Sequence, residues 1–136
     1  MDQDIQIVQQ PHLTDDELNQ LFLASWPGHV PRSFASVLAR SLVYFGAYLG
    51  SRPVGFVNVA WDGGVHAFLL DPTVHPDFRR QGIGLALLRS AASVAANSGV
   101  EWLHVDYETA LEPFYRAAGF EATRAGLLRV LLRPAV

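Results

Sequence analysis

The sequence predicts an α+β fold, in which a mixed, largely antiparallel sheet is flanked by helices within a single domain of residues 1–136. Amphipathic helical patterns occupy the first third of the chain, and three segments rich in β-branched and aromatic residues fill its middle. A long helix, a strand and a short helix then follow. A chain of 136 residues can bury roughly two thirds of its unfolded surface, and half of its residues are hydrophobic, which is ample material for a core.

The first third of the chain predicts a short strand and two helices. Residues 5–8 favour the strand. Thr14 and Glu17 have the spacing of a capping box, in which each end of the pair satisfies a free N–H group at a helix start. The apolar stripe that follows them ends near residues 26–28, and a second helix is expected over residues 33–42.

The middle of the chain predicts a meander of three strands. Residues 44–49 and 54–61 flank the turn-forming sequence Gly-Ser-Arg-Pro at 50–53, so they predict a hairpin. Residues 65–74 predict a third, longer strand. Pro72 lies inside this strand and cannot donate to the ladder, so we expect a bulge or a splayed strand end there.

The last third of the chain predicts two helices and two strands after a loop at residues 75–82. Apolar residues at helical spacing predict a strong helix over residues 83–97. Residues 102–107 favour a strand, and residues 113–119 favour a short helix with proline in its first turn and glycine at its end. The apolar run at 127–132 predicts a closing strand.

The composition excludes several classes of protein. The chain has no cysteine, which rules out disulfides, thiol nucleophiles and thiolate zinc sites, and its histidines show no ligand spacing, so we expect no metal. The net charge is −3 and no basic stripe suited to nucleic acid is present. No apolar run approaches the ~20 residues that cross a bilayer. The acidic start lacks the pattern of a signal peptide, so we expect a cytoplasmic protein that binds no membrane.

A glycine-bearing loop between a strand and a helix is the strongest functional signal. Residues 79–84 place Gly82 and Gly84 at the start of the long helix, where free N–H groups and a partial positive charge favour a phosphate. The Rossmann fingerprint requires a third glycine where Leu87 stands, and the Walker motif requires Gly-Lys-Ser/Thr, which is absent. A helix start with no ligand remains the alternative.

The residues around this loop resemble a known family. The stretch 73–88 resembles the core motif of the GCN5-related N-acetyltransferase (GNAT) superfamily, Arg/Gln-x-x-Gly-x-Gly/Ala, which Arg79, Gly82 and Gly84 match. Residues 114–120 resemble the Phe-Tyr-x-x-x-Gly-Phe helix of the same superfamily.

The resemblance implies acetyl-CoA as the cosubstrate. It implies that the main chain of Val74 pairs with the pantetheine arm, which would enter where the strands at 65–74 and 102–107 splay apart. It implies that the loop backbone binds the pyrophosphate. The residues expected around the cofactor in this loop are Arg79, Arg80, Gln81, Gly82, Ile83, Gly84 and Leu85.

The resemblance also implies the reaction, which is direct attack of an amine of a small molecule or peptide on the thioester. It places Tyr115 beside the departing sulfur. A phenol is a weaker acid than a thiol, so we expect Tyr115 to hydrogen-bond the developing thiolate. A non-catalytic acyl-CoA sensor and a protein N-terminal or lysine acetyltransferase are the alternatives. Family members often dimerise through terminal elements, so a homodimer through residues 127–132 is a further hypothesis.

The group that removes the amine proton stays open at the level of sequence. Asp71 on the predicted strand, Glu108 after the neighbouring strand and a water relay are the candidates. Trp26 and His29 lie between the first two helices, a segment that lines the acceptor pocket in the superfamily. The other histidines are expected to be structural.

Overall fold

A computed structural model describes residues 4–132, which form two compact parts, one up to Asp106 and one from Tyr107 onward. The elements of the first part are, in chain order, β1 (Ile5–Gln9), α1 (Asp15–Ser25), α2 (Ala35–Arg40), β2 (Val43–Leu49), β3 (Arg52–Trp61), β4 (His66–Val74), α3 (Ile83–Asn97) and β5 (Trp102–Val105). The second part contains α4 (Glu112–Ala117). No helix in the described range is long and apolar enough to cross a bilayer.

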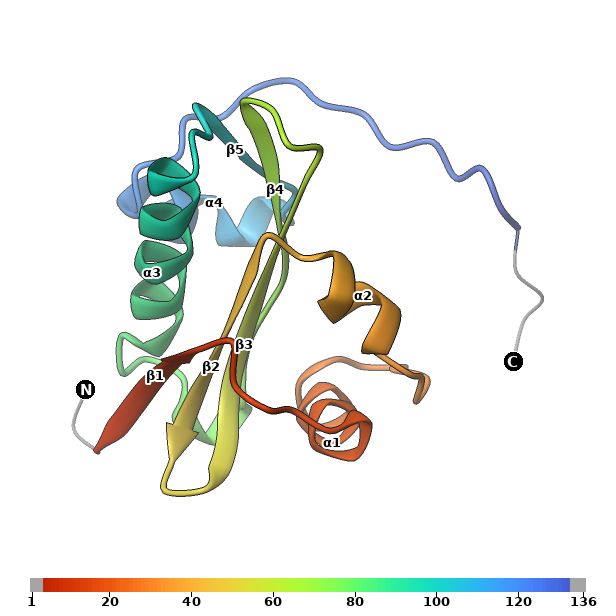
Figure 1. Ribbon diagram of the computed structural model, residues 1–136, viewed down its shortest axis with the longest axis vertical. Coiled ribbons are helices and arrows are strands. Elements are labelled where there is room, and N and C mark those ends of the chain that lie inside the picture. Colours follow the sequence, from red (N-terminus) through yellow and green to blue (C-terminus); the bar gives the residue numbers. More distant parts are fainter. Residues whose placement is uncertain (1–3, 133–136) are drawn as a thin grey trace. The chain divides into compact units, whose positions relative to one another are not determined.

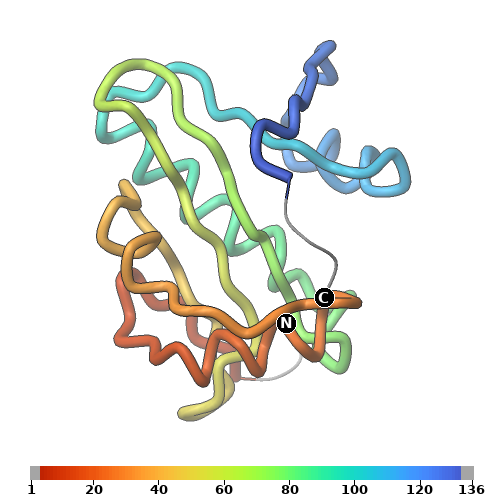
Figure 2. Tube along the Cα trace, turned by 90° about the vertical axis from the view of Figure 1, so that its right-hand side faces the viewer, coloured from red at the N-terminus to blue at the C-terminus, as the bar shows by residue number. Residues whose placement is uncertain are grey.

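The five strands form one sheet in the order β1-β2-β3-β4-β5. The first three pairings are antiparallel and the pairing of β4 with β5 is parallel. Figure 1 shows α3 on one face of this sheet and α1 and α2 on the other, and the reversal of the chain between β3 and β4 can be followed in Figure 2. The predicted α+β class, with its mixed, largely antiparallel sheet, is confirmed.

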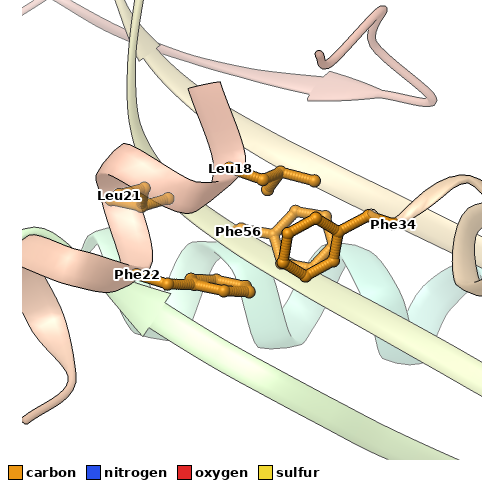
Figure 3. Packing of buried hydrophobic residues seen from close by; sticks show 5 residues of the cluster. All are labelled: Leu18, Leu21, Phe22, Phe34 and Phe56. Carbon is orange, nitrogen blue, oxygen red and sulfur yellow. The ribbon is translucent and has the colours of Figure 1, made fainter. Parts of the chain in front are cut away.

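An apolar cluster fixes α1 to the sheet. Leu18, Leu21 and Phe22 project from one stripe of α1 and pack with Phe34 and Phe56, as Figure 3 shows. The rings of Phe22 and Phe34 meet edge to face, with centroids 5.2 Å apart. Burial of these five large side chains stabilises the packing of α1 against the sheet. Because Phe22 precedes the segment that joins α1 to α2 and Phe34 lies at its end, the cluster also fixes this segment on both sides.

The start of α1 has the capping box that the sequence predicts. The Glu17 N–H donates to Thr14 Oγ1 at 3.1 Å, and the Thr14 N–H donates to Glu17 Oε1 at 3.0 Å. Such caps contribute about 1 kcal/mol each to helix stability, so the helix begins at a defined residue and its apolar stripe faces the sheet.

A bulge interrupts β4 at the position where the sequence predicts one. Phe56 pairs with Thr73 and Asn58 pairs with Leu70, so β4 carries one residue more than β3 over this stretch. Asp71 lies in the bulge with φ of +55°, a left-handed conformation that Asp tolerates better than most residues. The bulge re-aims the Asp71 side chain relative to a regular strand.

The pairing of β4 with β5 is short because β5 ends at Val105, and the splay of these two strands stays a prediction. The pairing begins where His66 lies opposite Trp102 and ends where Leu69 lies opposite Val105, whereas β4 continues to Val74. The stretch of β4 beyond Leu69 has no ladder partner on that side within the described first part. Within the first part, the main-chain edge on this side of β4 is therefore free beside the loop that follows the strand.

The second part confirms one predicted element and corrects another. The short helix has Pro113 in its first turn, and Gly119 follows it with φ of +103°. The predicted strand at residues 127–132 is wrong, since the chain from 121 to 132 contains no strand. A strand requires a paired backbone, and the side chains here are exposed, Leu127 by 87% and Val130 by 88%.

Candidate active site

The loop before α3 presents free N–H groups. Gly82 is the N-cap of α3 with φ of +84°, and Arg80 has φ of +64°. The first N–H bonded inside the helix is that of Ala86, which donates to Gly82 O at 3.1 Å. The N–H groups of residues 83–85 therefore have no acceptor within the helix, and the helix dipole places partial positive charge there.

The same loop fits a pyrophosphate-bearing group. A Cβ atom built at Gly82 meets no heavy atom within 4 Å, so the space in front of this residue is open. The first turn of α3 has no acidic residue, and Arg79 and Arg80 add positive charge. Gln81 Oε1 is buried without a hydrogen-bond partner among the described residues, which leaves an acceptor for a donor of a bound ligand.

Val74 and the loop are in direct contact. Arg79 Nε donates a hydrogen bond of 3.1 Å to the carbonyl oxygen of Val74. The structure thus brings together the strand end and the loop that the sequence assigns to the cofactor. The sequence does not predict this contact. A pantetheine amide that donates to the Val74 carbonyl oxygen would share that oxygen with the Arg79 guanidinium.

Asp71 is electrostatically coupled to the connection between α1 and α2, here defined as residues 26–34. Burial raises the pKa of the Asp71 carboxyl, and the positive charges of Arg32 and His29 partly offset that rise. Burial lowers the pKa of His29; Arg32 lowers it further and Asp71 raises it. These mutual effects place Asp71, His29 and Arg32 in one electrostatic cluster in the first part.

The raised pKa of Asp71 predicts that this carboxylate destabilises the fold at neutral pH. Its contribution to stability is greatest below the unfolded pKa of about 3.9 and is lost as pH rises through the folded pKa. Asp71→Asn removes this titration. We expect the melting temperature of the variant to match wild type near about pH 3.5 and to exceed it at about pH 7. Thermal unfolding followed by circular dichroism measures this, and a lower melting temperature at neutral pH contradicts it.

One asparagine clamps the α1–α2 connection. Asn19 Nδ2 donates to the carbonyl of Arg32 at 2.8 Å, and Asn19 Oδ1 accepts from the Arg32 N–H at 3.0 Å. The same oxygen lies 2.9 Å from His29 Nε2. Trp26 stacks on Phe22 with centroids 4.4 Å apart, so its indole packs onto the aromatic cluster while remaining half-exposed.

The second part holds the remaining two candidates. Tyr115 is buried, stacks on Tyr107 with centroids 4.7 Å apart, and meets the edges of Phe114 and Phe120. Burial raises the pKa of its phenol, which favours hydrogen-bond donation over proton release. Glu108 is exposed and its carbonyl accepts from the Leu111 N–H at 2.8 Å.

The other histidines have structural surroundings. His75 Nδ1 accepts from the Asp77 N–H at 3.1 Å, as expected of a loop residue. His66 Nδ1 and His104 Nε2 are 2.9 Å apart on an exposed stretch of β4 and β5, so they pair at the surface. The described residues contain no cluster of three or more His, Cys, Asp or Glu side chains that could hold a metal.

Comparison with known families decides how this geometry is interpreted. Residues 40–122 match the model of the acetyltransferase (GNAT) domain. The chain belongs to this family. The GNAT match covers the bulge of β4, the loop at 79–85 and the helix that carries Tyr115.

Individual relatives agree with the GNAT assignment. An N-acetyltransferase of Methanocaldococcus jannaschii, itself uncharacterised, is 35% identical over 102 residues, which are 66% of this chain and 45% of that protein. The chain spans less than half the length of the curated relatives that it matches. A GNAT-family acetyltransferase from Streptococcus pneumoniae has a TM-score of 0.81 and 26% identity, over 95% of this chain and 99% of that one.

A further GNAT structure is similar in fold alone. An aminoglycoside N-acetyltransferase solved in complex with CoA has a TM-score of 0.75 at 20% identity, with 95% of each chain covered. Its complex shows that this fold accommodates CoA in that protein.

Proposed function

We propose that this protein transfers an acetyl group from acetyl-CoA to an amine of a small molecule or peptide by direct attack. The observation that carries the proposal is the start of α3, where three free N–H groups and an open glycine lie beside the end of β4. This stretch of β4 pairs with β3 but has no partner on its β5 side within the first part. In a GNAT chain, that combination suits the pyrophosphate and the pantetheine arm of CoA.

The proposed cofactor contacts follow from this geometry. The loop backbone donates to the phosphates, the arginines add charge, and the β4 edge pairs with the amides of the arm. The residues assigned to acetyl-CoA are Val74, Arg79, Arg80, Gln81, Gly82, Ile83, Gly84 and Leu85.

The proposed chemistry requires a neutral amine and a stabilised leaving thiolate. An alkylamine has a pKa near 10.4, so its neutral form is disfavoured at pH 7 by roughly 4.6 kcal/mol. Asp71, in the first part, has a half-buried carboxylate that suits an ammonium group, and it is one candidate for removing the amine proton. Glu108 and water are the other candidates for that role. Tyr115 is assigned to the departing sulfur. Two named relatives, an N-acetyltransferase and an aminoglycoside N-acetyltransferase, support an amine as acceptor.

A screen of amines tests the proposal. Release of CoA thiol from acetyl-CoA is followed with polyamines, aminoglycosides, arylamines, amino acids and peptides as acceptors, and the acetylated product is identified by mass spectrometry. We expect turnover with at least one amine. CoA binding without turnover would instead indicate a sensor module, and turnover confined to peptides would indicate a protein acetyltransferase.

We also propose that the chain forms a homodimer through residues 127–132. Five of these six residues are apolar and exposed by 64–88%. A nearly continuous apolar run, here interrupted only by Arg129, is typical of a strand that is covered on both faces, and a second copy of the chain provides such a cover. We expect light scattering to give twice the chain mass of 14.9 kDa. The double substitution Leu128→Asp and Leu131→Asp should give a monomer; a monomeric wild type at tens of micromolar contradicts the proposal.

A further inference from the structure

The imidazole of His29 is held in a defined orientation by groups on three sides. His29 Nε2 lies 2.9 Å from Asn19 Oδ1. The ring is parallel to Phe34 within 16° at a centroid distance of 6.5 Å, and it meets the edge of Phe22 at 5.4 Å. Phe22 and Phe34 belong to the buried cluster that joins α1 to the sheet. The imidazole is therefore positioned by the core and not by a mobile surface contact.

The hydrogen bonds of Asn19 determine which nitrogen of His29 carries the proton. Asn19 Nδ2 donates to the Arg32 carbonyl, so the other amide atom is the oxygen. That oxygen accepts from the Arg32 N–H as well. It has no hydrogen to give, and His29 Nε2 must be the donor. The neutral ring then has its lone pair on Nδ1, for which the described residues provide no hydrogen-bond partner.

Charged groups around His29 keep this lone pair available. Arg32, on the same connection, carries a positive charge that disfavours protonation of the imidazole and so lowers the pKa of His29. Asp71, in the bulge of β4, carries a negative charge that has the opposite effect and raises the pKa of His29. Burial is the largest influence and it lowers the pKa of His29, which favours the neutral ring.

We infer that His29 is the proton acceptor of the transfer, and that its Nδ1 atom takes the proton which the acceptor amine loses before it attacks the thioester. This inference rests on the proposed acetyl transfer. Asp71, three residues before Val74 on β4, holds the ammonium group as an ion pair. A neutral imidazole is a better base than an ion-paired carboxylate for work near neutral pH.

The proton balance of this scheme is complete. The substrate ammonium gives one proton to His29 Nδ1 and becomes a neutral amine. The amine nitrogen bonds to the acetyl carbon as the carbon–sulfur bond breaks, and the second proton lost by nitrogen ends on the CoA thiol. The imidazolium then releases its proton to solvent, so an ammonium and acetyl-CoA yield an amide, CoA thiol and one free proton.

Three substitutions test the inference in steady-state kinetics with an amine that the wild type acetylates. His29→Gln keeps a donor near Asn19 but cannot accept a proton, so we expect kcat to fall about 100-fold near pH 7, within the range for general bases. The loss should shrink toward pH 10, where solvent deprotonates an alkylamine. Asp71→Asn should mainly raise KM. His12→Gln, an exposed histidine on the same part, serves as the control and should change neither constant.

A charge change at Asn19 separates a base from a merely structural histidine. Asn19→Asp places a negative charge beside the ring, which raises the pKa of the imidazole and should move the acid limb of the kcat–pH profile to higher pH. If His29 has only a packing role, Asn19→Asp should lower kcat and leave the acid limb of the kcat–pH profile at the same pH.

Nitrogen-15 NMR provides a readout independent of activity. At about pH 8, above the ordinary histidine pKa near 6.5, we expect His29 to carry its proton on Nε2; an Nδ1–H tautomer overturns the inference. The inference is also overturned if the wild type acetylates an amine and the kcat of His29→Gln is within threefold of the wild-type kcat. That result leaves the proposed function intact. No turnover by the wild type with any amine instead refutes the proposed function itself.

Discussion

Replacement of Gly82 by valine should weaken CoA binding by more than about 100-fold while the fold persists. The side chain of valine would occupy the open space in front of the α3 N-terminus, where we place the pyrophosphate. Hydrogen bonds to charged groups contribute about 1.5–3 kcal/mol each, so the loss of two main-chain bonds corresponds to about 3–6 kcal/mol, and each 1.4 kcal/mol is tenfold in affinity.

A matched control separates the ligand effect from backbone strain. Gly82 has φ of +84°, and Gly99, just beyond the other end of α3, has φ of +92°; a Cβ at either position meets open space. Valine at each should therefore cost a similar amount of stability, of order 1–3 kcal/mol. We expect calorimetry to show lost CoA binding for Gly82→Val and unchanged binding for Gly99→Val. Unchanged CoA affinity in folded Gly82→Val would remove the loop from the cofactor site.

Local signals made most of the fold predictable. The capping box of Thr14 and Glu17 and the apolar stripe behind it specify α1 within a few neighbouring residues. Pro72 lacks an N–H group, so the interruption of β4 follows from a property of one residue. Each of these elements depends on residues that are close together in the chain.

The closing strand was mispredicted because strand formation is not a local property. Residues 127–132 have the composition of a buried strand, yet no strand pairs with them in the described second part. Composition indicates how well a segment would fit a sheet, whereas the ladder depends on a partner that the segment itself does not encode.

The candidate site divides along the same line. The loop at 79–85 is continuous in sequence, so the glycines before a helix, together with the resemblance of residues 73–88 to the GNAT motif, selected it as the candidate site. The clamp of His29 joins it to Asn19, ten residues earlier and on another element. In the sequence Asn19 is an ordinary polar residue of a helix, and only the fold shows that its amide sets the tautomer of a histidine.

Tyr115→Phe should lower kcat about 100-fold and leave acetyl-CoA affinity nearly unchanged. The substitution removes one hydroxyl from a buried ring that packs on Tyr107, Phe114 and Phe120. A hydrogen bond to sulfur strengthens as negative charge develops there, so the loss falls on the transition state. A 100-fold effect lies at the low end of the range for general acids, as fits a phenol whose pKa burial raises.

The pH dependence and a neighbouring tyrosine make this test specific. Because the raised pKa keeps the Tyr115 phenol protonated between about pH 7 and 9, the ratio of wild-type to variant kcat should be constant over that range. Tyr107→Phe removes a hydroxyl from the stacked partner ring in the same part and should retain wild-type kcat. A kcat of Tyr115→Phe within threefold of wild type, well under about 1 kcal/mol, indicates packing alone or another slow step. Single-turnover rates decide between those two, since a slower chemical step appears there even when product release limits turnover.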